Sequence, residues 1–180
     1  IVTDPGSPLD VESRAAGYRV FNADPNVGGR YSALTAFGLV PSGLAGADIA
    51  ALLDSAIAAS PALGSDSADN PALSLGALLA RSANGADFKD KFLIESDGLA
   101  GFGDWVEQLV AESTGKEARG TLPVVVDGSA PEISALPSDT LLIRFASDVT
   151  GNTDAVFYGS LGELFLLWEY ATVIAGYLQG

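Results

Sequence analysis

Short, continuous apolar runs alternate along the chain with longer segments whose apolar residues recur every three or four positions. Continuous runs are typical of buried parallel strands, and the three-to-four spacing is typical of helices with one buried face. The runs predict five strands, at residues 1–3, 18–21, 91–95, 122–126 and 141–145. The alternation therefore predicts an α/β fold, with one five-stranded parallel sheet and helices on both of its faces.

Proline, glycine and capping residues set the limits of the predicted helices. These helices cover residues 9–16, 31–44 (broken by Pro41), 49–59, a segment that begins at Pro71, and 161–178. The segments 22–30, 60–70, 127–138 and 147–155 are rich in turn residues and are predicted loops. The last helix carries Glu163 and Glu169, so it is interpreted as a buried helix and not as a membrane span.

One further helix, within residues 101–116, presents a carboxylate beside an amide. Its apolar stripe consists of Phe102, Trp105, Val106, Leu109 and Val110. Gln108 and Glu112 are four residues apart, which places them one above the other on the same flank. Gly115 then ends the helix. Taken alone, this flank is either a solvated acidic surface or part of a site.

Composition limits the chemistry and the partners. The formal net charge is −14, from 23 acidic and 9 basic residues, which disfavours binding to nucleic acid or to an anionic membrane surface. The absence of Cys excludes disulfides and thiolate metal sites and fits a reducing compartment. His is also absent, so acid–base chemistry must use carboxylates, Lys, Arg or Tyr.

A second candidate stretch lies between a predicted strand and a helix. Gly28 and Gly29 allow a ligand to approach the backbone closely, and Arg30 favours negative charge there. The same sequence is equally compatible with a plain turn. Ligands in open parallel sheets bind outside the carboxyl ends of the strands, so we expect Arg30 and Glu112 to converge in one cleft at that edge.

Together the two stretches resemble a known family. Residues 27–39 (VGGRYSALTAFGL) resemble the signature of phosphoglucose isomerase, in which Gly-Gly-Arg-Tyr/Phe-Ser opens a helix. Residues 108–116 (QLVAESTGK) are similar to that family's Gln-x-x-x-Glu-Ser-Asn-Gly-Lys, with Thr114 in place of Asn. Residues 3–9 resemble the first strand and turn of its second sugar-isomerase (SIS) domain, and residues 168–170 (WEY), within 164–180, resemble the start of its terminal Tyr-Glu-His signature helix.

The resemblance implies that residues 1–180 form this second SIS domain, truncated at both ends relative to the full enzyme. The domain resembles the compact bacterial type, which is also found fused to transaldolase. It implies a three-layer, doubly wound, flavodoxin-like fold. The activity implied is the interconversion of glucose 6-phosphate and fructose 6-phosphate through an enediolate, in the cytoplasm, without metal or cofactor.

The resemblance also implies roles for single residues. Glu112 is similar to the base that moves a proton between C1 and C2, Arg30 to the cation beside the enediolate, and Gly29 and Gln108 to residues lining the sugar site. The family's phosphate-binding Ser and Thr and a catalytic Lys would lie outside these 180 residues. The partners implied are a sugar phosphate, the first SIS domain of the same polypeptide and a second copy in a homodimer.

Two alternatives accompany this interpretation. The chain could be a non-catalytic SIS module that binds sugar phosphates in a regulator, although such a module needs no proton-transfer base. The isolated 180 residues are expected to fold but not to isomerise sugars at a useful rate. Ser113 and Lys116 are interpreted as turn and cap residues, and Trp105 and Trp168 as core.

Overall fold

A four-stranded parallel sheet forms the centre of the protein. The computed structural model describes residues 1–80, 89–96, 98–117, 119–146 and 151–180. In these residues the strand order is β4-β3-β5-β6, with all neighbours parallel. The strands are β3 (Lys91–Glu95), β4 (Leu122–Val126), β5 (Thr140–Phe145) and β6 (Ala155–Phe157). The predicted α/β class with parallel strands and flanking helices is confirmed.

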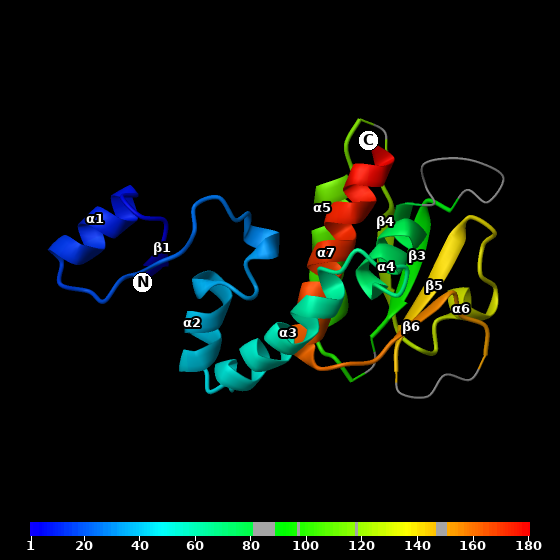
Figure 1. Cartoon of the computed structure of the whole chain (residues 1–180), viewed down its shortest axis with the longest axis horizontal. Coiled ribbons are helices and arrows are strands. Elements are labelled where there is room, and N and C mark those ends of the chain that lie inside the picture. Colours follow the sequence, from blue (N-terminus) through cyan, green and yellow to red (C-terminus); the bar gives the residue numbers. More distant parts are fainter. Residues whose placement is uncertain (81–88, 97, 118, 147–150) are drawn as a thin grey trace.

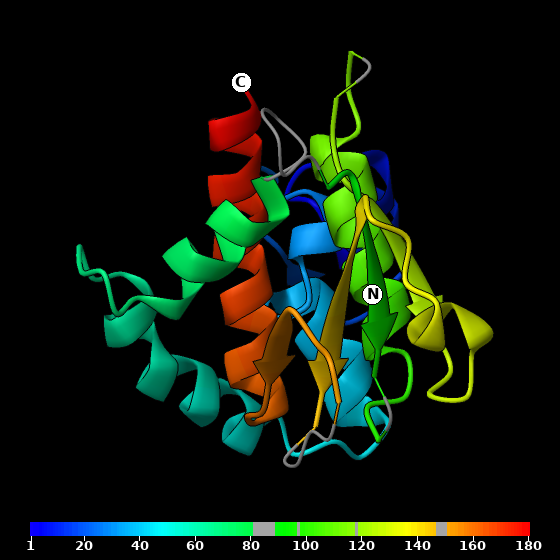
Figure 2. The same ribbon diagram turned by 90° about the vertical axis from the view of Figure 1, so that its right-hand side faces the viewer.

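In the described part of the chain, three helices lie on one face of this sheet, and a fourth packs against them from outside. They are α3 (Ile49–Leu63), α4 (Pro71–Leu79), α5 (Phe102–Thr114) and α7 (Leu161–Gln179). Figures 1 and 2 show α4, α5 and α7 on the same side of the strands, and α3 packs against α7. Alternate residues of the strands, such as Phe92 and Ile94, are fully buried beneath them.

The opposite face of the sheet is less covered. Leu93 and Leu142 are buried there at its centre, whereas Leu122, Val124 and Val156 are 54, 37 and 41% exposed. The short helix α6 (Pro131–Ser134) follows β4. The main hydrophobic core therefore lies between the sheet and helices α3, α4, α5 and α7.

The prediction of one five-stranded sheet is wrong in its strand pairing. The first two predicted strands pair with each other in a separate parallel sheet, formed by β1 (Val2–Thr3) and β2 (Phe21–Asn22). The fourth strand of the main sheet is β6, which begins inside the predicted loop 147–155; residues 147–150 of that loop lie outside the described residues. An apolar run identifies a strand but not its partner, because pairing is decided by tertiary contacts.

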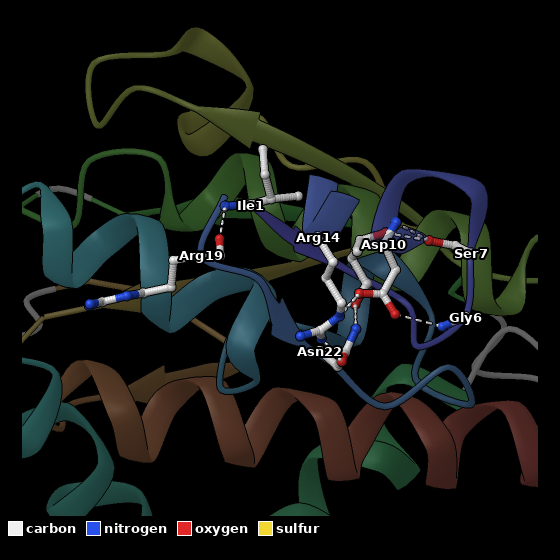
Figure 3. Close-up of polar contacts among 8 residues, drawn as sticks. Ile1, Gly6, Ser7, Asp10, Arg14, Arg19 and Asn22 are labelled. Carbon is white, nitrogen blue, oxygen red and sulfur yellow. Dashed lines mark hydrogen bonds and ion pairs between the residues drawn. The ribbon is translucent and has the colours of Figure 1, made fainter. Parts of the chain in front are cut away.

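The helix α1 (Pro8–Ala15) connects β1 to β2, and polar contacts hold these elements together (Figure 3). The Asp10 carboxylate accepts hydrogen bonds from Gly6 N–H (2.8 Å) and Arg14 Nε (2.6 Å). Arg14 Nη2 also donates to Asn22 Oδ1 (2.7 Å), which links α1 to β2. The Gly6 N–H, with the Arg14 guanidinium, holds the pKa of the Asp10 carboxyl below its usual value.

A 3₁₀ turn, η1 (Gly29–Tyr31), and helix α2 (Ala36–Leu44) lead from this N-terminal unit to α3. The predicted helix 31–44 thus begins later than expected, with the Thr35 hydroxyl as its cap, and it contains Pro41. Helix α3 continues through Pro61 into the predicted loop 60–70.

Helix α7 matches the predicted terminal helix within one residue. Among the described residues it alone is long and apolar enough to cross a membrane. It packs against α3, α4 and α5, and its residues Trp168, Ala171 and Ala175 are fully buried. The buried face of α7 therefore belongs to the core, whereas Val173 and Tyr177 on the same helix are 60 and 86% exposed.

Candidate active site

The turn η1 places Arg30 against the C-terminal half of α5. Arg30 Nη1 lies 3.2 Å from Glu112 Oε2, and Arg30 Nε donates to Ser113 Oγ at 2.8 Å. The two side chains of the ion pair are 25 and 53% exposed, respectively. The expected convergence of Arg30 and Glu112 is therefore observed, although 82 positions separate them in the sequence.

The amide of Gln108 contacts the other oxygen of the same carboxylate. Gln108 Nε2 donates to Glu112 Oε1 at 3.2 Å, one helical turn away. Glu112 thus accepts one hydrogen bond from its own helix on Oε1 and one from Arg30 on Oε2. Because a carboxylate has about four lone-pair sites, these two contacts leave acceptor capacity for a ligand.

Ser113 and Tyr31 belong to the same cluster. The Tyr31 hydroxyl donates to Ser113 Oγ at 3.2 Å, and the Tyr31 ring lies 5.7 Å from the Arg30 guanidinium carbon. Sequence reasoning missed this role for Ser113, which was interpreted as a turn or cap residue. Its position next to Glu112 was the available signal.

Trp105 serves both the core and the site. Its ring packs against Phe102 and Phe165, which agrees with the interpretation of Trp105 as a core residue. Its indole Nε1–H also donates to the Arg30 carbonyl oxygen at 3.0 Å. Trp105 and Glu112 are seven residues apart, or two helical turns, so α5 contacts both the backbone and the side chain of Arg30.

Gly29 lies at the start of η1, beside Arg30. Its carbonyl oxygen accepts hydrogen bonds from the N–H and the hydroxyl of Ser32, at 3.1 and 2.6 Å. A Cβ atom built on Gly29 meets nothing within 4 Å. Space is therefore open next to Gly29 on the surface formed by the described residues.

The Arg30–Glu112 pair is not at the carboxyl edge of the sheet, where we expected it. Helix α5 begins just after β3, at the carboxyl edge, and returns toward the amino edge. Near its end, Thr114 Oγ1 accepts a hydrogen bond from the N–H of Thr121, the residue that precedes β4. Glu112 is two residues before the end of α5 and therefore lies near the amino ends of the strands.

A separate cavity occupies the carboxyl edge. Its volume is about 480 Å³, and its lining includes Glu95, Arg144, Phe157 and Leu164. Arg144 Nε lies 2.6 Å from Glu95 Oε2, so these two lining side chains form an ion pair. The cavity lies between β3, whose connection leads to β4 on one side, and β5, whose connection leads to β6 on the other side; such a switch point is where α/β folds commonly bind ligands.

A further charged residue, Lys116, lies close to the pair in sequence. It is exposed and lines a hollow of about 270 Å³ beside Ser113.

Within the described ranges, no three His, Cys, Asp or Glu residues are grouped so as to hold a metal ion.

Comparison with known proteins shows which proteins this chain resembles in sequence. The chain is 39% identical over 119 residues to glucose-6-phosphate isomerase of Streptococcus pyogenes serotype M49, and 38% identical over 121 residues to that of Streptococcus agalactiae serotype III. Each match covers 64% of this chain and 26% of the relative. The chain is related to the glucose-6-phosphate isomerases. It spans about a quarter of the length of these relatives.

A solved structure supports the fold independently of these sequences. The crystal structure of a hypothetical protein from Thermus thermophilus superposes with a TM-score of 0.78, at 22% sequence identity, over 97% of this chain and 56% of the other. No family model matches the chain.

Proposed function

We propose that this chain carries the proton-transfer centre of a glucose-6-phosphate isomerase. The observation that carries the proposal is the 3.2 Å contact between Arg30 Nη1 and Glu112 Oε2, in a chain that is 39% identical over 119 residues to a protein of that name. Two separate sequence segments supply a carboxylate and a guanidinium to one spot, as proton abstraction beside a carbonyl requires.

In the proposed reaction, the Glu112 carboxylate removes the proton from C2 of the open-chain aldose and returns it to C1, while the hydroxyl proton of O2 passes to O1, so that the carbonyl moves from C1 to C2. Arg30 stabilises the negative charge that develops on the enediolate oxygen, a role that a permanently charged guanidinium suits well. Gln108 holds the Glu112 carboxylate through Oε1, and the open space at Gly29 admits the sugar.

We further propose that other parts of the same polypeptide, including a first SIS domain, complete the site in a cytoplasmic homodimer. Supporting this, the Glu112 side chain is 53% exposed in this chain, and exposed charges interact weakly in water. Additional chain over the pair would exclude water and hold the phosphate of the substrate. For the same reason, we expect the 180 residues alone to isomerise poorly.

The decisive experiment measures isomerisation of glucose 6-phosphate by the complete protein, with Glu112→Gln as the test variant and Glu107→Gln as the control. Glu107 is an exposed carboxylate on the same helix. We expect Glu112→Gln to lose at least about a hundredfold in kcat while it still binds the sugar phosphate. Near-normal turnover in Glu112→Gln would refute the assigned role.

The competing function is a regulatory module that binds sugar phosphates without chemistry. It predicts a different result in the same assay, because a wild-type protein of this kind would bind glucose 6-phosphate and show no isomerisation. The Gln108–Glu112–Arg30 arrangement favours the enzyme, since binding alone does not require a carboxylate next to the cation.

A further inference from the structure

We propose that Ser113 is a positioning residue, which orients the Arg30 guanidinium for catalysis. This inference rests on the proposed function and extends it to a residue that does not itself act on the sugar. The starting observation is the 2.8 Å hydrogen bond from Arg30 Nε to Ser113 Oγ, which is shorter than the 3.2 Å contact of Arg30 Nη1 with Glu112.

Two contacts of Arg30 hold it in place, and a third joins its guanidinium to the carboxylate of the proposed reaction. Trp105 Nε1–H fixes the Arg30 carbonyl, and Ser113 Oγ fixes Nε at the root of the guanidinium. Nη1 reaches Glu112, at the outer end of the side chain. Since the guanidinium is planar and rigid, fixing Nε together with the backbone determines where both Nη groups lie.

The hydroxyl of Ser113 differs from that of its neighbour Thr114. Thr114 Oγ1 donates to the Val110 carbonyl (2.8 Å) and accepts from Thr121 N–H (3.3 Å), so it ties the helix to the next strand. Ser113 Oγ instead contacts the side chains of Arg30 and Tyr31. The Ser113 hydroxyl thus contacts residues of the candidate site, whereas the Thr114 hydroxyl links α5 to the residue before β4.

Removing the Ser113 hydroxyl should release the guanidinium without unfolding the helix. Alanine favours helices more than serine does, so Ser113→Ala conserves or improves the local propensity. The Arg30 side chain, no longer held at Nε, would sample several rotamers, and a misplaced catalytic group reduces the rate strongly. Ser113→Thr retains a hydroxyl on the Cβ atom.

The test compares Ser113→Ala, Ser113→Thr and Thr114→Val in the complete protein. For Ser113→Ala we expect kcat to fall about tenfold or more, with KM within about threefold and the thermal midpoint nearly unchanged. Ser113→Thr should recover most of kcat. Thr114→Val should lower the thermal midpoint and leave kcat close to that of the wild type.

Each outcome decides one question. If the wild type isomerises glucose 6-phosphate and Ser113→Ala stays within about twofold of its kcat, the positioning role is overturned while the proposed function stands. The role is also overturned if Ser113→Ala loses activity only in proportion to a lowered thermal midpoint, or if Ser113→Thr rescues nothing. If the wild type itself does not isomerise glucose 6-phosphate, both the proposed function and this inference are wrong.

Discussion

The guanidinium of Arg30 lies 3.2 Å from the carboxylate of Glu112, although one residue comes from the turn η1 and the other from the end of helix α5. This contact joins the linker that follows the N-terminal unit to the main α/β core. Each partner lies in one of the two segments that carry the family motifs. The structure therefore brings the two motifs together in one place.

Replacing Arg30 by lysine tests whether charge alone is sufficient. Lysine keeps the positive charge but is a single point donor, so it cannot contact Ser113 and Glu112 with the fixed geometry of a guanidinium. We expect Arg30→Lys to lose about tenfold or more in kcat/KM for glucose 6-phosphate. Arg19→Lys, at an exposed position, is the matched control. Equal activity in the two variants would show that the fork geometry of Arg30 is irrelevant.

The site was predictable from sequence to the extent that its motifs are local. Gln108 and Glu112 share a helix flank by simple periodicity, and the structure connects them at 3.2 Å. The contact of Arg30 with Glu112 followed from two motifs read together. The positions of Ser113 and Trp105 around Arg30 depend on how η1 docks on α5, which no local pattern encodes.

The fold shows the same division between local pattern and tertiary arrangement. The runs at β3, β4 and β5 were identified because each is a compact apolar segment. The pairing of β1 with β2 was missed because periodicity does not say which sheet a strand joins. The strand β6 was missed because it is three residues long and follows a polar segment. The edge at which the site lies was also missed, since it depends on where along α5 the docking occurs.

Close packing of α7 on α3 gives a stability prediction. A Cβ atom at Gly162 would lie 2.0 Å from the Leu52 carbonyl oxygen and 2.4 Å from Ser55 Oγ. Since backbone cannot yield as a flexible side chain does, we expect Gly162→Ala to lower the free energy of unfolding by about 1–3 kcal/mol. Guanidinium chloride unfolding, followed by circular dichroism, measures the change.

Gly176 supplies the matched control on the same helix. A Cβ atom there meets nothing within 4 Å, so Gly176→Ala should be neutral or stabilising by up to about 1 kcal/mol, because alanine restricts the unfolded chain. If both variants are destabilised to the same extent, the α3–α7 contact is not what Gly162 preserves.

The partly buried carboxyl of Glu169 predicts a pH dependence. Glu169 lies on α7 beside an apolar cavity of about 310 Å³ lined by Tyr31, Tyr170 and others, and its Oε1 has no hydrogen-bond partner among the described residues. Burial raises the pKa of Glu169 from 4.5 to about 7. Between these values the native state binds more protons than the unfolded state, so this group's contribution to stability declines as pH rises from about 5 to 8.

Glu169→Gln removes the ionisation while it keeps the shape. Compared with wild type, we expect the variant to gain stability on the order of 1–2 kcal/mol between pH 5 and pH 8, a figure reduced because the side chain is only partly buried. Thermal or denaturant unfolding at the two pH values measures this change, with the exposed Glu107→Gln as the control. If the difference in the free energy of unfolding between wild type and variant does not change with pH, the titration is wrongly assigned to Glu169.

The polar cluster around Asp10 predicts how the N-terminal unit opens (Figure 3). Asp10 accepts from Gly6 N–H and from Arg14 Nε, and Arg14 continues to Asn22 on β2. Asp10→Asn removes the charge that strengthens both bonds to the carboxylate. We expect amide hydrogen exchange in β1 and β2 to accelerate by about tenfold or more, with little change in the core strands.

The same cluster fixes the direction of the pH effect. The pKa of Asp10 is lowered in the folded protein, so its contribution is present above the unfolded value of 3.8 and is lost as pH falls through the folded pKa. Exchange in β1 and β2 of the wild type should therefore approach that of Asp10→Asn at acidic pH, after correction for the intrinsic exchange rate. Asp4→Asn, at an exposed position in the preceding turn, serves as the control. If Asp4→Asn accelerates exchange as much as Asp10→Asn does, the link from α1 to β2 through Arg14 is not what holds this unit together.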